Sequence, residues 1–304
     1  MISESIARTL ASEAGESLFR FLREVFYIEK AKGSFLLDPD HKGYSQMVHQ
    51  ALDMSLLEET GPGCLKLTPI GYEVANFAKE YCNWIDEGRS LPLGMMPSML
   101  NGKRLLDVGC SFGRHLASFS KRGTIGYGID LQEDYLLLSR VFAQREGIKS
   151  PHIARADAIQ LPFRSGEFDI VFCNLVLNYV HCVDSAISEF ARVLKPGGQL
   201  VLGVETFRRI IKSLLHDQWI GNFRQIAFKL YGIMNTLVLE TTGRQIKIKV
   251  QGRMHAVHSP TWPSGRWIQK KLLRHGFLPA EGKSFRDKDN AGLFKAVLRF
   301  DTLG

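Results

Sequence analysis

Residues 105–114 read Leu105-Leu106-Asp107-Val108-Gly109-Cys110-Ser111-Phe112-Gly113-Arg114. An apolar run that ends in an acid and is followed by small residues predicts a buried parallel strand, a tight turn and the start of a helix. Gly109 and Gly113 let a ligand approach the backbone where a side chain would block it. The stretch therefore predicts a site for a nucleotide-like cofactor at the carboxyl end of a sheet. Its G-x-S-x-G spacing, with Ser111 in the middle, favours a smaller group than a pyrophosphate.

Two more predicted strand ends carry acids. Asp130 ends a strand that starts at Gly126, where a carboxylate can accept hydrogen bonds from two ribose hydroxyls. Asp157 follows a third strand and can accept a hydrogen bond from an exocyclic amine such as that of adenine. The pattern then continues with a strand over Phe168–Asn174, a helix from about Cys182 to Leu194, the turn Lys195-Pro196-Gly197-Gly198 and a strand over Gln199–Val204.

At this point the chain resembles the class I S-adenosyl-L-methionine-dependent methyltransferases of the small-molecule type. The resemblance spans about residues 103–205, with a looser match from Thr261 onward. It implies an α/β fold with a Rossmann-like, doubly wound, seven-stranded sheet, and S-adenosyl-L-methionine as the cofactor. Five motifs carry it, in the family's order and spacing: Asp107–Gly113, Gly128–Asp130, Ala156–Ala158, Phe168–Val171 and Arg192–Gly198.

The resemblance assigns cofactor-binding roles to matching positions. The methionine end would be lined by Asp107, Gly109 and Ser111, with Gly113 closing the same loop, although Ser111 stands where the family often has Gly. Asp130 would hold the ribose. Leu131 would pack on the adenine, and Asp157 and Ala158 would contact the adenine edge. Asn174 would lie near the methionine amino group and the sulfonium.

Methyl transfer also needs groups that act on the acceptor. The segment Asn174–His181 leaves the fourth strand beside the expected methyl group, so His181 is the candidate general base. A structural histidine at the start of a helix is the alternative. Tyr179 is expected to line the site and face the sulfonium, or else to be a core aromatic residue. Further candidate bases are His255, His258 and Glu205.

Composition and charge limit the other possibilities. The 304 residues are 45% hydrophobic, which supports a folded core of one large or two modest domains. We see no apolar run long enough for a transmembrane helix, and the five cysteines show no metal-ligand spacing, so we expect a cytoplasmic protein without a metal site. The net charge of +8 is uneven: residues 1–102 carry −5, residues 103–205 carry +1 and residues 206–304 carry +12.

Residues 1–95 predict a separate, mostly helical domain. Helical patterns cover Glu4–Ser12, Ser17–Lys30 and Tyr44–Met54, a hairpin follows around Gly61-Pro62-Gly63, and Thr68 caps a last helix. This order resembles a winged helix, which either reads DNA or pairs subunits. Its recognition helix, Tyr44–Met54, holds no Lys or Arg, so nucleic acid is a poor partner. Similar domains in the family dimerise and cover the substrate, which implies a homodimer.

The second domain, residues 96–304, contains an insertion at about 206–259. Its first part predicts a helix over Phe207–Tyr231, and its second part, Leu237–Val250, predicts a hairpin. It is either a substrate lid or a packing element. If it is a basic lid with aromatic residues, an acidic or phosphorylated substrate, or RNA, would suit it.

The first functional hypothesis is therefore a small-molecule O-, N- or C-methyltransferase, with a role in secondary metabolism. The alternatives are an RNA methyltransferase that uses the basic C-terminal third, a transcriptional regulator that binds the cofactor without catalysis, and an enzyme of this fold that uses the cofactor for another reaction.

Overall fold

The computed structural model describes residues 1–12, 15–32, 35–36, 45–62, 64–148, 151–206, 223–242, 261–280 and 293–299. The chain divides into two compact units. The first unit contains residues 1–92, 110–121 and 133–153, and the second contains residues 93–109, 122–132 and 154–304. No helix among the described residues combines the length and the apolar character needed to cross a bilayer.

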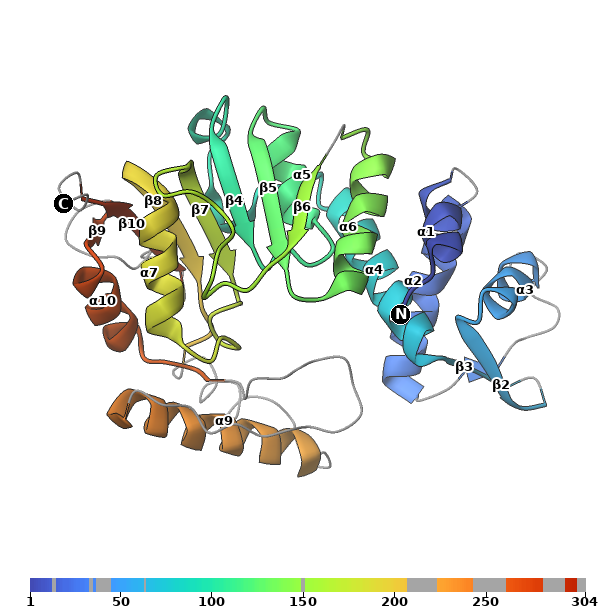
Figure 1. The fold of residues 1–304 in the computed structure, drawn as a ribbon. Coiled ribbons are helices and arrows are strands. Elements are labelled where there is room, and N and C mark those ends of the chain that lie inside the picture. The colour runs from blue at the N-terminus through green and yellow to red at the C-terminus, as the bar shows by residue number, and fades with distance from the viewer. Residues whose placement is uncertain are drawn as a thin grey trace. The chain divides into compact units, whose positions relative to one another are not determined.

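The second unit is built on a seven-stranded sheet, as predicted (Figure 1). The strand order is β6-β5-β4-β7-β8-β10-β9. Neighbours β4, β5, β7 and β8 run parallel, whereas β10 runs antiparallel to β8 and β9. The strands are β4 (Arg104–Val108), β5 (Ile125–Asp130), β6 (His152–Arg155), β7 (Phe168–Asn174), β8 (Leu194–Gly203), β9 (Phe277–Pro279) and β10 (Leu293–Leu298).

Helices α7 (Val183–Val193) and α10 (Gly265–Arg274) pack with this sheet. Ile187 and Phe190 on α7 and Ile268 on α10 are fully buried in one cluster with Val171 and Leu200 of the strands. The predicted helix Cys182–Leu194 and the strand Phe168–Asn174 are confirmed. The predicted turn Lys195–Gly198 lies within β8, where the pairing with β7 shifts register between Phe168 and Ile170.

The first unit joins the N-terminal segment to two helices from later in the chain. Its elements are α1 (Glu4–Ala11), α2 (Gly15–Lys32), β1 (Phe35–Leu36), α3 (Ser45–Asp53), β2 (Leu57–Gly61), β3 (Cys64–Leu67), α4 (Pro69–Asp86), α5 (Arg114–Ser120) and α6 (Glu133–Arg145). The predicted hairpin is β2–β3, and β1 adds to it in the order β1-β3-β2. Thr68 caps α4 as predicted, since its hydroxyl accepts a hydrogen bond from the backbone N–H of Gly71.

Helices α4, α5 and α6 share one aromatic core. The Trp84 ring lies 5.0 Å from that of Phe142, and the Phe77 ring lies 5.5 Å from that of Phe112. The indole N–H of Trp84 also donates to Ser118 Oγ at 2.7 Å. The N-terminal segment therefore packs on helices that follow β4 and β5 in the chain, and the predicted division at residue 95 stays a prediction.

The insertion contains a long helix, α9 (Phe223–Thr242). The predicted hairpin over Leu237–Val250 is wrong for Leu237–Thr242, which is helical. The helix continues through these residues because its buried side chains, Asn235, Thr236 and Leu239, recur at helical spacing. The rest of that hairpin and residues 207–222 of the predicted helix lie outside the described residues, as do His255 and His258.

Candidate functional site

The predicted cofactor residues of the second unit follow the carboxyl edge of its sheet. Asp107 lies near the end of β4, Asp130 ends β5 and Asn174 ends β7. The strand order reverses between β4 and β7, which is where α/β sheets bind ligands. Asn174 pairs with Gly203, so the carboxyl end of β8 lies one strand further along. With strands about 4.8 Å apart, these side chains are placed along a line that a nucleoside can span.

Asp107 is the most unusual residue at this edge. Its side chain is 1% exposed, and its Oδ2 atom is buried without a hydrogen-bond partner. Burial, together with the nearby charge of Asp130, raises the pKa of Asp107 to about 8. A buried carboxyl group with an unused oxygen is costly to the folded protein, and such groups concentrate at functional sites.

The turn after β4 requires left-handed backbone at three residues. Gly109, Ser111 and Gly113 have φ of 71°, 48° and 81°. A Cβ on Gly109 would lie 2.2 Å from Val176 Cγ2, and one on Gly113 would lie 2.3 Å from Ser139 Oγ. The two glycines are therefore sterically required, whereas Ser111 adopts the left-handed conformation without being a glycine.

The adenosine-side candidates lie near the ends of β5 and β6. Asp130 Oδ1 accepts the backbone N–H of Gln132 at 3.0 Å, and the backbone N–H of Ala156 donates to the Asp130 carbonyl at 3.2 Å. Asp157 Oδ1 likewise accepts the N–H of Ile159, which fixes its turn. Ala158 is buried, whereas Leu131 is 44% exposed, as expected for an apolar side chain that covers a flat ligand.

The acceptor-side candidates follow β7. Gly203 makes room for Asn174, because a Cβ there would lie 2.1 Å from Asn174 Oδ1. Tyr179 lies in a turn and its side chain is 49% exposed, so it is not a core residue. Its hydroxyl is nevertheless partly buried, and this burial, followed by the charge of Glu205, raises the pKa of Tyr179. His181 is half-buried and lies just before α7 rather than within it.

A hydrogen-bond cluster at the end of β8 was not expected from the sequence. The buried Asn178 amide donates to the carbonyls of Glu205 and Thr261, at 2.9 and 2.6 Å, and accepts the Glu205 N–H. Trp262 then donates its indole N–H to Glu205 Oε2 at 3.3 Å. Glu205, named only as a third candidate base, is thereby fixed beside Tyr179. The only sequence signal for Glu205 was that it follows a predicted strand. Its hydrogen-bond partners could not be predicted, because they lie 27 and 57 residues away in the sequence.

Helix α9 attaches to this cluster. The Trp262 backbone N–H donates to Thr236 Oγ1 at 2.7 Å, and the Ser264 N–H donates to Glu240. Gly232 lies directly against the Trp262 ring, since a Cβ there would come within 2.3 Å of it. The described part of the insertion is thus fixed to the segment that binds Glu205.

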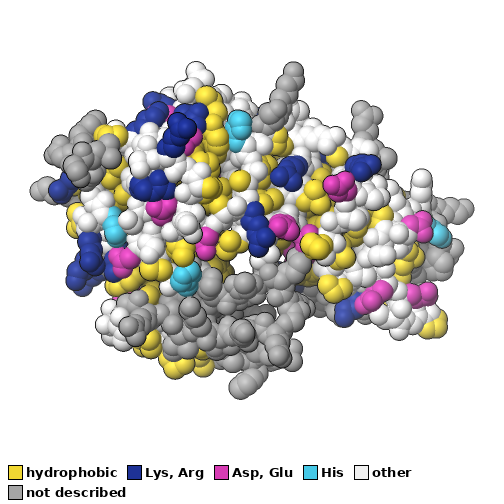
Figure 2. Space-filling view, in the orientation of Figure 1, with side chains coloured by type: hydrophobic (Ala, Val, Ile, Leu, Met, Phe, Trp, Pro, Cys, Tyr) yellow, Lys and Arg dark blue, Asp and Glu magenta, His cyan; other side chains and the backbone are white. Residues whose placement is uncertain are grey.

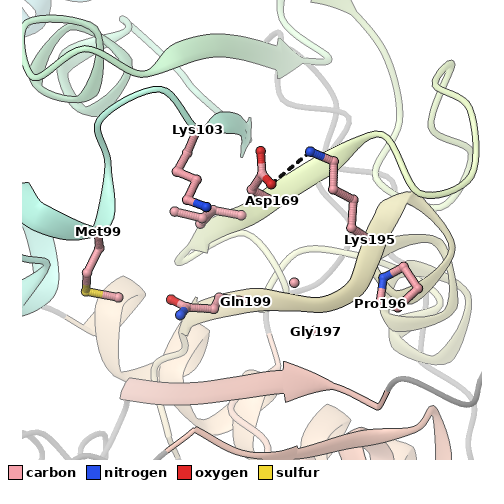
Figure 3. Close-up of a pocket in the computed structure, with 9 residues that line it drawn as sticks. Met99, Lys103, Asp169, Lys195, Pro196, Gly197 and Gln199 are labelled. Carbon is pink, nitrogen blue, oxygen red and sulfur yellow. Dashed lines mark hydrogen bonds and ion pairs between the residues drawn. The ribbon is translucent and has the colours of Figure 1, made fainter.

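A pocket of about 320 Å³ lies elsewhere on the second unit (Figure 3). Its lining includes Lys103 and Asp169, which lie at the amino ends of β4 and β7, and Lys195, which bonds Asp169 at 2.8 Å. Ligands of open α/β sheets bind at the carboxyl ends, so this pocket is not the cofactor site. No cluster of three metal-binding side chains occurs within the described ranges. None of the five cysteines forms a disulfide.

Residues 106–202 match a protein-family model described as a methyltransferase domain. A ubiquinone biosynthesis O-methyltransferase of Vibrio parahaemolyticus is 32% identical over 155 residues, 47% of this chain and 65% of that protein. The enzyme of the same name from Dechloromonas aromatica is 37% identical over 136 residues, 44% of this chain and 53% of its own. The chain spans 52 to 65% of the length of the first curated relatives that it matches.

Among solved structures, a magnesium protoporphyrin IX methyltransferase from Synechocystis PCC 6803 aligns with 84% of this chain and 96% of its own, at 17% identity and a TM-score of 0.45. The family match covers β5, β6 and β7 and most of β4 and β8, and it includes all of the candidate cofactor residues. Residues 106–202 are thus similar to a methyltransferase domain.

Proposed function

We propose that the whole protein is an S-adenosyl-L-methionine-dependent methyltransferase that acts on a small-molecule acceptor. The observation that carries the proposal is the buried, unpartnered Asp107 carboxyl group, which lies within the matched domain and two residues before the sterically required Gly109. A cofactor whose methionine end carries an ammonium and a sulfonium group would supply the missing partner. The residues present therefore fit the cofactor.

In this proposal the chain holds the cofactor along the carboxyl edge. Its methionine end lies at Asp107 and at the turn formed by Gly109, Ser111 and Gly113. Asp130 accepts hydrogen bonds from the ribose hydroxyls. The other contacts come from Leu131 on the adenine face, Asp157 and Ala158 at the adenine edge, and Asn174 near the methionine amino group. When bound, the cofactor supplies an electrophilic methyl group on positively charged sulfur.

The chain's own contribution to the reaction is to position the acceptor and to accept its proton. We assign the proton to His181, because an imidazole is the side chain that proteins most often use as a general base. Tyr179 presents a half-exposed ring beside the same loop. Holding the acceptor near attack distance supplies most of the remaining rate enhancement.

The acceptor class is supported by the relatives. Those named above are O-methyltransferases of ubiquinone biosynthesis, which favours transfer to a hydroxyl oxygen of a small molecule. RNA stays the alternative acceptor, because the basic excess lies in residues 206–304. Outside that third of the chain, Arg104, Arg192 and Lys195 are each paired with a carboxylate. In Figure 2, Lys and Arg side chains at the upper left likewise have acidic neighbours.

We also propose a winged-helix-like N-terminal domain, residues 1–95, that pairs subunits and covers the acceptor. Supporting features are the sheet order β1-β3-β2 and helix α3 directly before the hairpin. Helix α3 has no Lys or Arg, which disfavours duplex binding. We keep the cytoplasm as the expected compartment.

The test is to incubate the protein with methyl-labelled cofactor and fractionated cell extract, and to follow the label. We expect it in a small molecule, and the Asp130→Ala variant should transfer much less label at the same cofactor concentration. Label in RNA would favour the alternative substrate. Cofactor binding without any transfer would contradict the enzymatic proposal.

A further inference from the structure

The carboxyl group of Asp107 is buried without a compensating positive charge. Its side chain is 1% exposed, and Oδ2 has no hydrogen-bond partner. Within the described part of the chain, no Lys, Arg or His side chain bonds to it. An ionised carboxylate in such a place lacks both water and a counter-ion, so burial favours the neutral form.

The neighbouring elements reinforce this state. On β5, Asp130 is a second acid, and its charge disfavours ionisation of Asp107. On β7, burial and then Asp107 raise the pKa of the Cys173 thiol, which stays neutral. The loop after β7 presents the apolar Val176 to Gly109. His115, the first histidine after the turn, carries no charge, because burial and then Arg114 lower its pKa to about 3.

We infer that Asp107 is a protonated carboxylic acid in the cofactor-free protein, and that binding of the cationic methionine end of the cofactor expels this proton. The inference rests on the proposed function and extends it to a proton-coupled binding step. The arriving ammonium and sulfonium charges supply the counter-ion that the folded chain lacks. Once they are a few ångströms away, the ionised carboxylate becomes the favoured form.

The coupling predicts a specific pH dependence. Burial and Asp130 hold the pKa of free Asp107 at about 8, so at pH 5.5–7.0 nearly all of the free protein carries this proton. If the proton must leave, cofactor affinity rises close to tenfold per pH unit, or about thirtyfold over this range. Over this range the carboxylate of the cofactor stays ionised and its ammonium group stays largely protonated.

The experiment is isothermal calorimetry with S-adenosyl-L-methionine at pH 6.5 in buffers of different ionisation enthalpy, which counts the protons released. We expect about one proton per cofactor bound for the natural chain and close to none for Asp107→Asn. Asp169→Asn is the matched control, because Asp169 lies on β7 at the opposite edge of the sheet and is ionised by its contact with Lys195. This control should release the same proton as the natural chain.

A second readout does not depend on any variant. Difference infrared spectroscopy of the natural chain should show the band of a protonated carboxylic acid vanish when the cofactor binds. Binding without proton release, or equal release by Asp107→Asn, would overturn the inference while leaving the proposed function intact. Failure of the natural chain to bind the cofactor at all would overturn both.

Discussion

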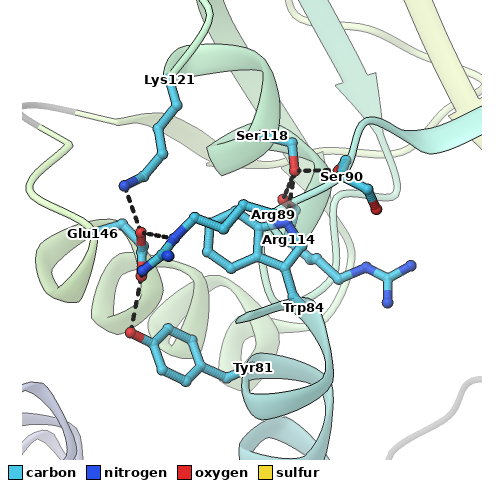
Figure 4. Close-up of polar contacts among 8 residues, drawn as sticks. All are labelled: Tyr81, Trp84, Arg89, Ser90, Arg114, Ser118, Lys121 and Glu146. Carbon is cyan, nitrogen blue, oxygen red and sulfur yellow. Dashed lines mark hydrogen bonds and ion pairs between the residues drawn. The ribbon is translucent and has the colours of Figure 1, made fainter. Parts of the chain in front are cut away.

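Replacing Glu146 with Gln should destabilise the first unit substantially. The Glu146 side chain is 1% exposed, yet it accepts hydrogen bonds from Lys121 Nζ at 2.6 Å, Arg89 Nε at 3.1 Å and the Tyr81 hydroxyl at 2.9 Å (Figure 4). These partners lie on α4, in the residues just after it, and at the end of α5, whereas Glu146 directly follows α6. One carboxylate therefore connects the N-terminal segment to α5 and α6, two helices within residues 106–202.

The magnitude follows from burial. Removing one partner of a fully buried ion pair costs about 3–5 kcal/mol. Here Arg89 and Lys121 keep 43% and 33% of their side-chain surface exposed, so water can solvate the cations that remain. We therefore expect a loss of about 2–3 kcal/mol in the free energy of unfolding, measured by urea denaturation followed by circular dichroism. Glu80→Gln is the control, since Glu80 is 33% exposed and its pairs should contribute less than about 1 kcal/mol.

The effect should also depend on pH in a defined direction. Burial alone would raise the pKa of Glu146, but the hydrogen bonds from Lys121, Arg89 and Tyr81 outweigh it and hold the pKa below the ordinary 4.5. A lowered folded-state pKa stabilises the fold above the unfolded value, and that stabilisation is lost as pH falls through the folded one. The difference between the natural chain and Glu146→Gln should thus be full at pH 7 and shrink below about pH 4.5. A variant within 0.5 kcal/mol of the natural chain at pH 7 would refute the reasoning.

Three further changes test the proposed site and its supports. Asp130→Ala should weaken cofactor binding at least a hundredfold, about 3 kcal/mol, because two ribose hydroxyls lose a charged acceptor; unchanged affinity by calorimetry would rule out the ribose role. His181→Ala should lower kcat by about 10²–10⁴-fold while cofactor affinity stays the same, and full turnover in a labelled-methyl assay would place the base elsewhere. Gly232→Ala should destabilise the packing of α9, because the added Cβ would collide with Trp262. In an exposed helix the same change stabilises the helix by up to about 1 kcal/mol. Faster hydrogen exchange in α9 is the expected signature, and slower exchange would contradict the packing.

Much of the sheet and of its turn was predictable because the signals are local. The strand Phe168–Asn174 was predicted with its observed bounds, since seven residues bounded by turn signals report burial directly. The turn after Asp107 was predictable because glycine adopts positive φ at little cost, and Thr68-Pro69 is a cap followed by a favoured first helical residue. In each case the physical cause lies within a few residues of the effect.

Long-range packing explains what the sequence left open or misjudged. The alternation of Ile246, Ile248 and Val250 with polar residues suggested a hairpin from Leu237 onward, but residues 237–242 continue helix α9, which Thr236 fixes to Trp262 across 26 residues. Glu205 gained its partners from positions 178 and 262, and Glu146 gained its partners from three separate parts of the chain. The acid at position 107 was visible in the printed sequence. Its lack of a counter-ion was not, because desolvation depends on which strands and loops enclose a group, and those come together only when the chain folds.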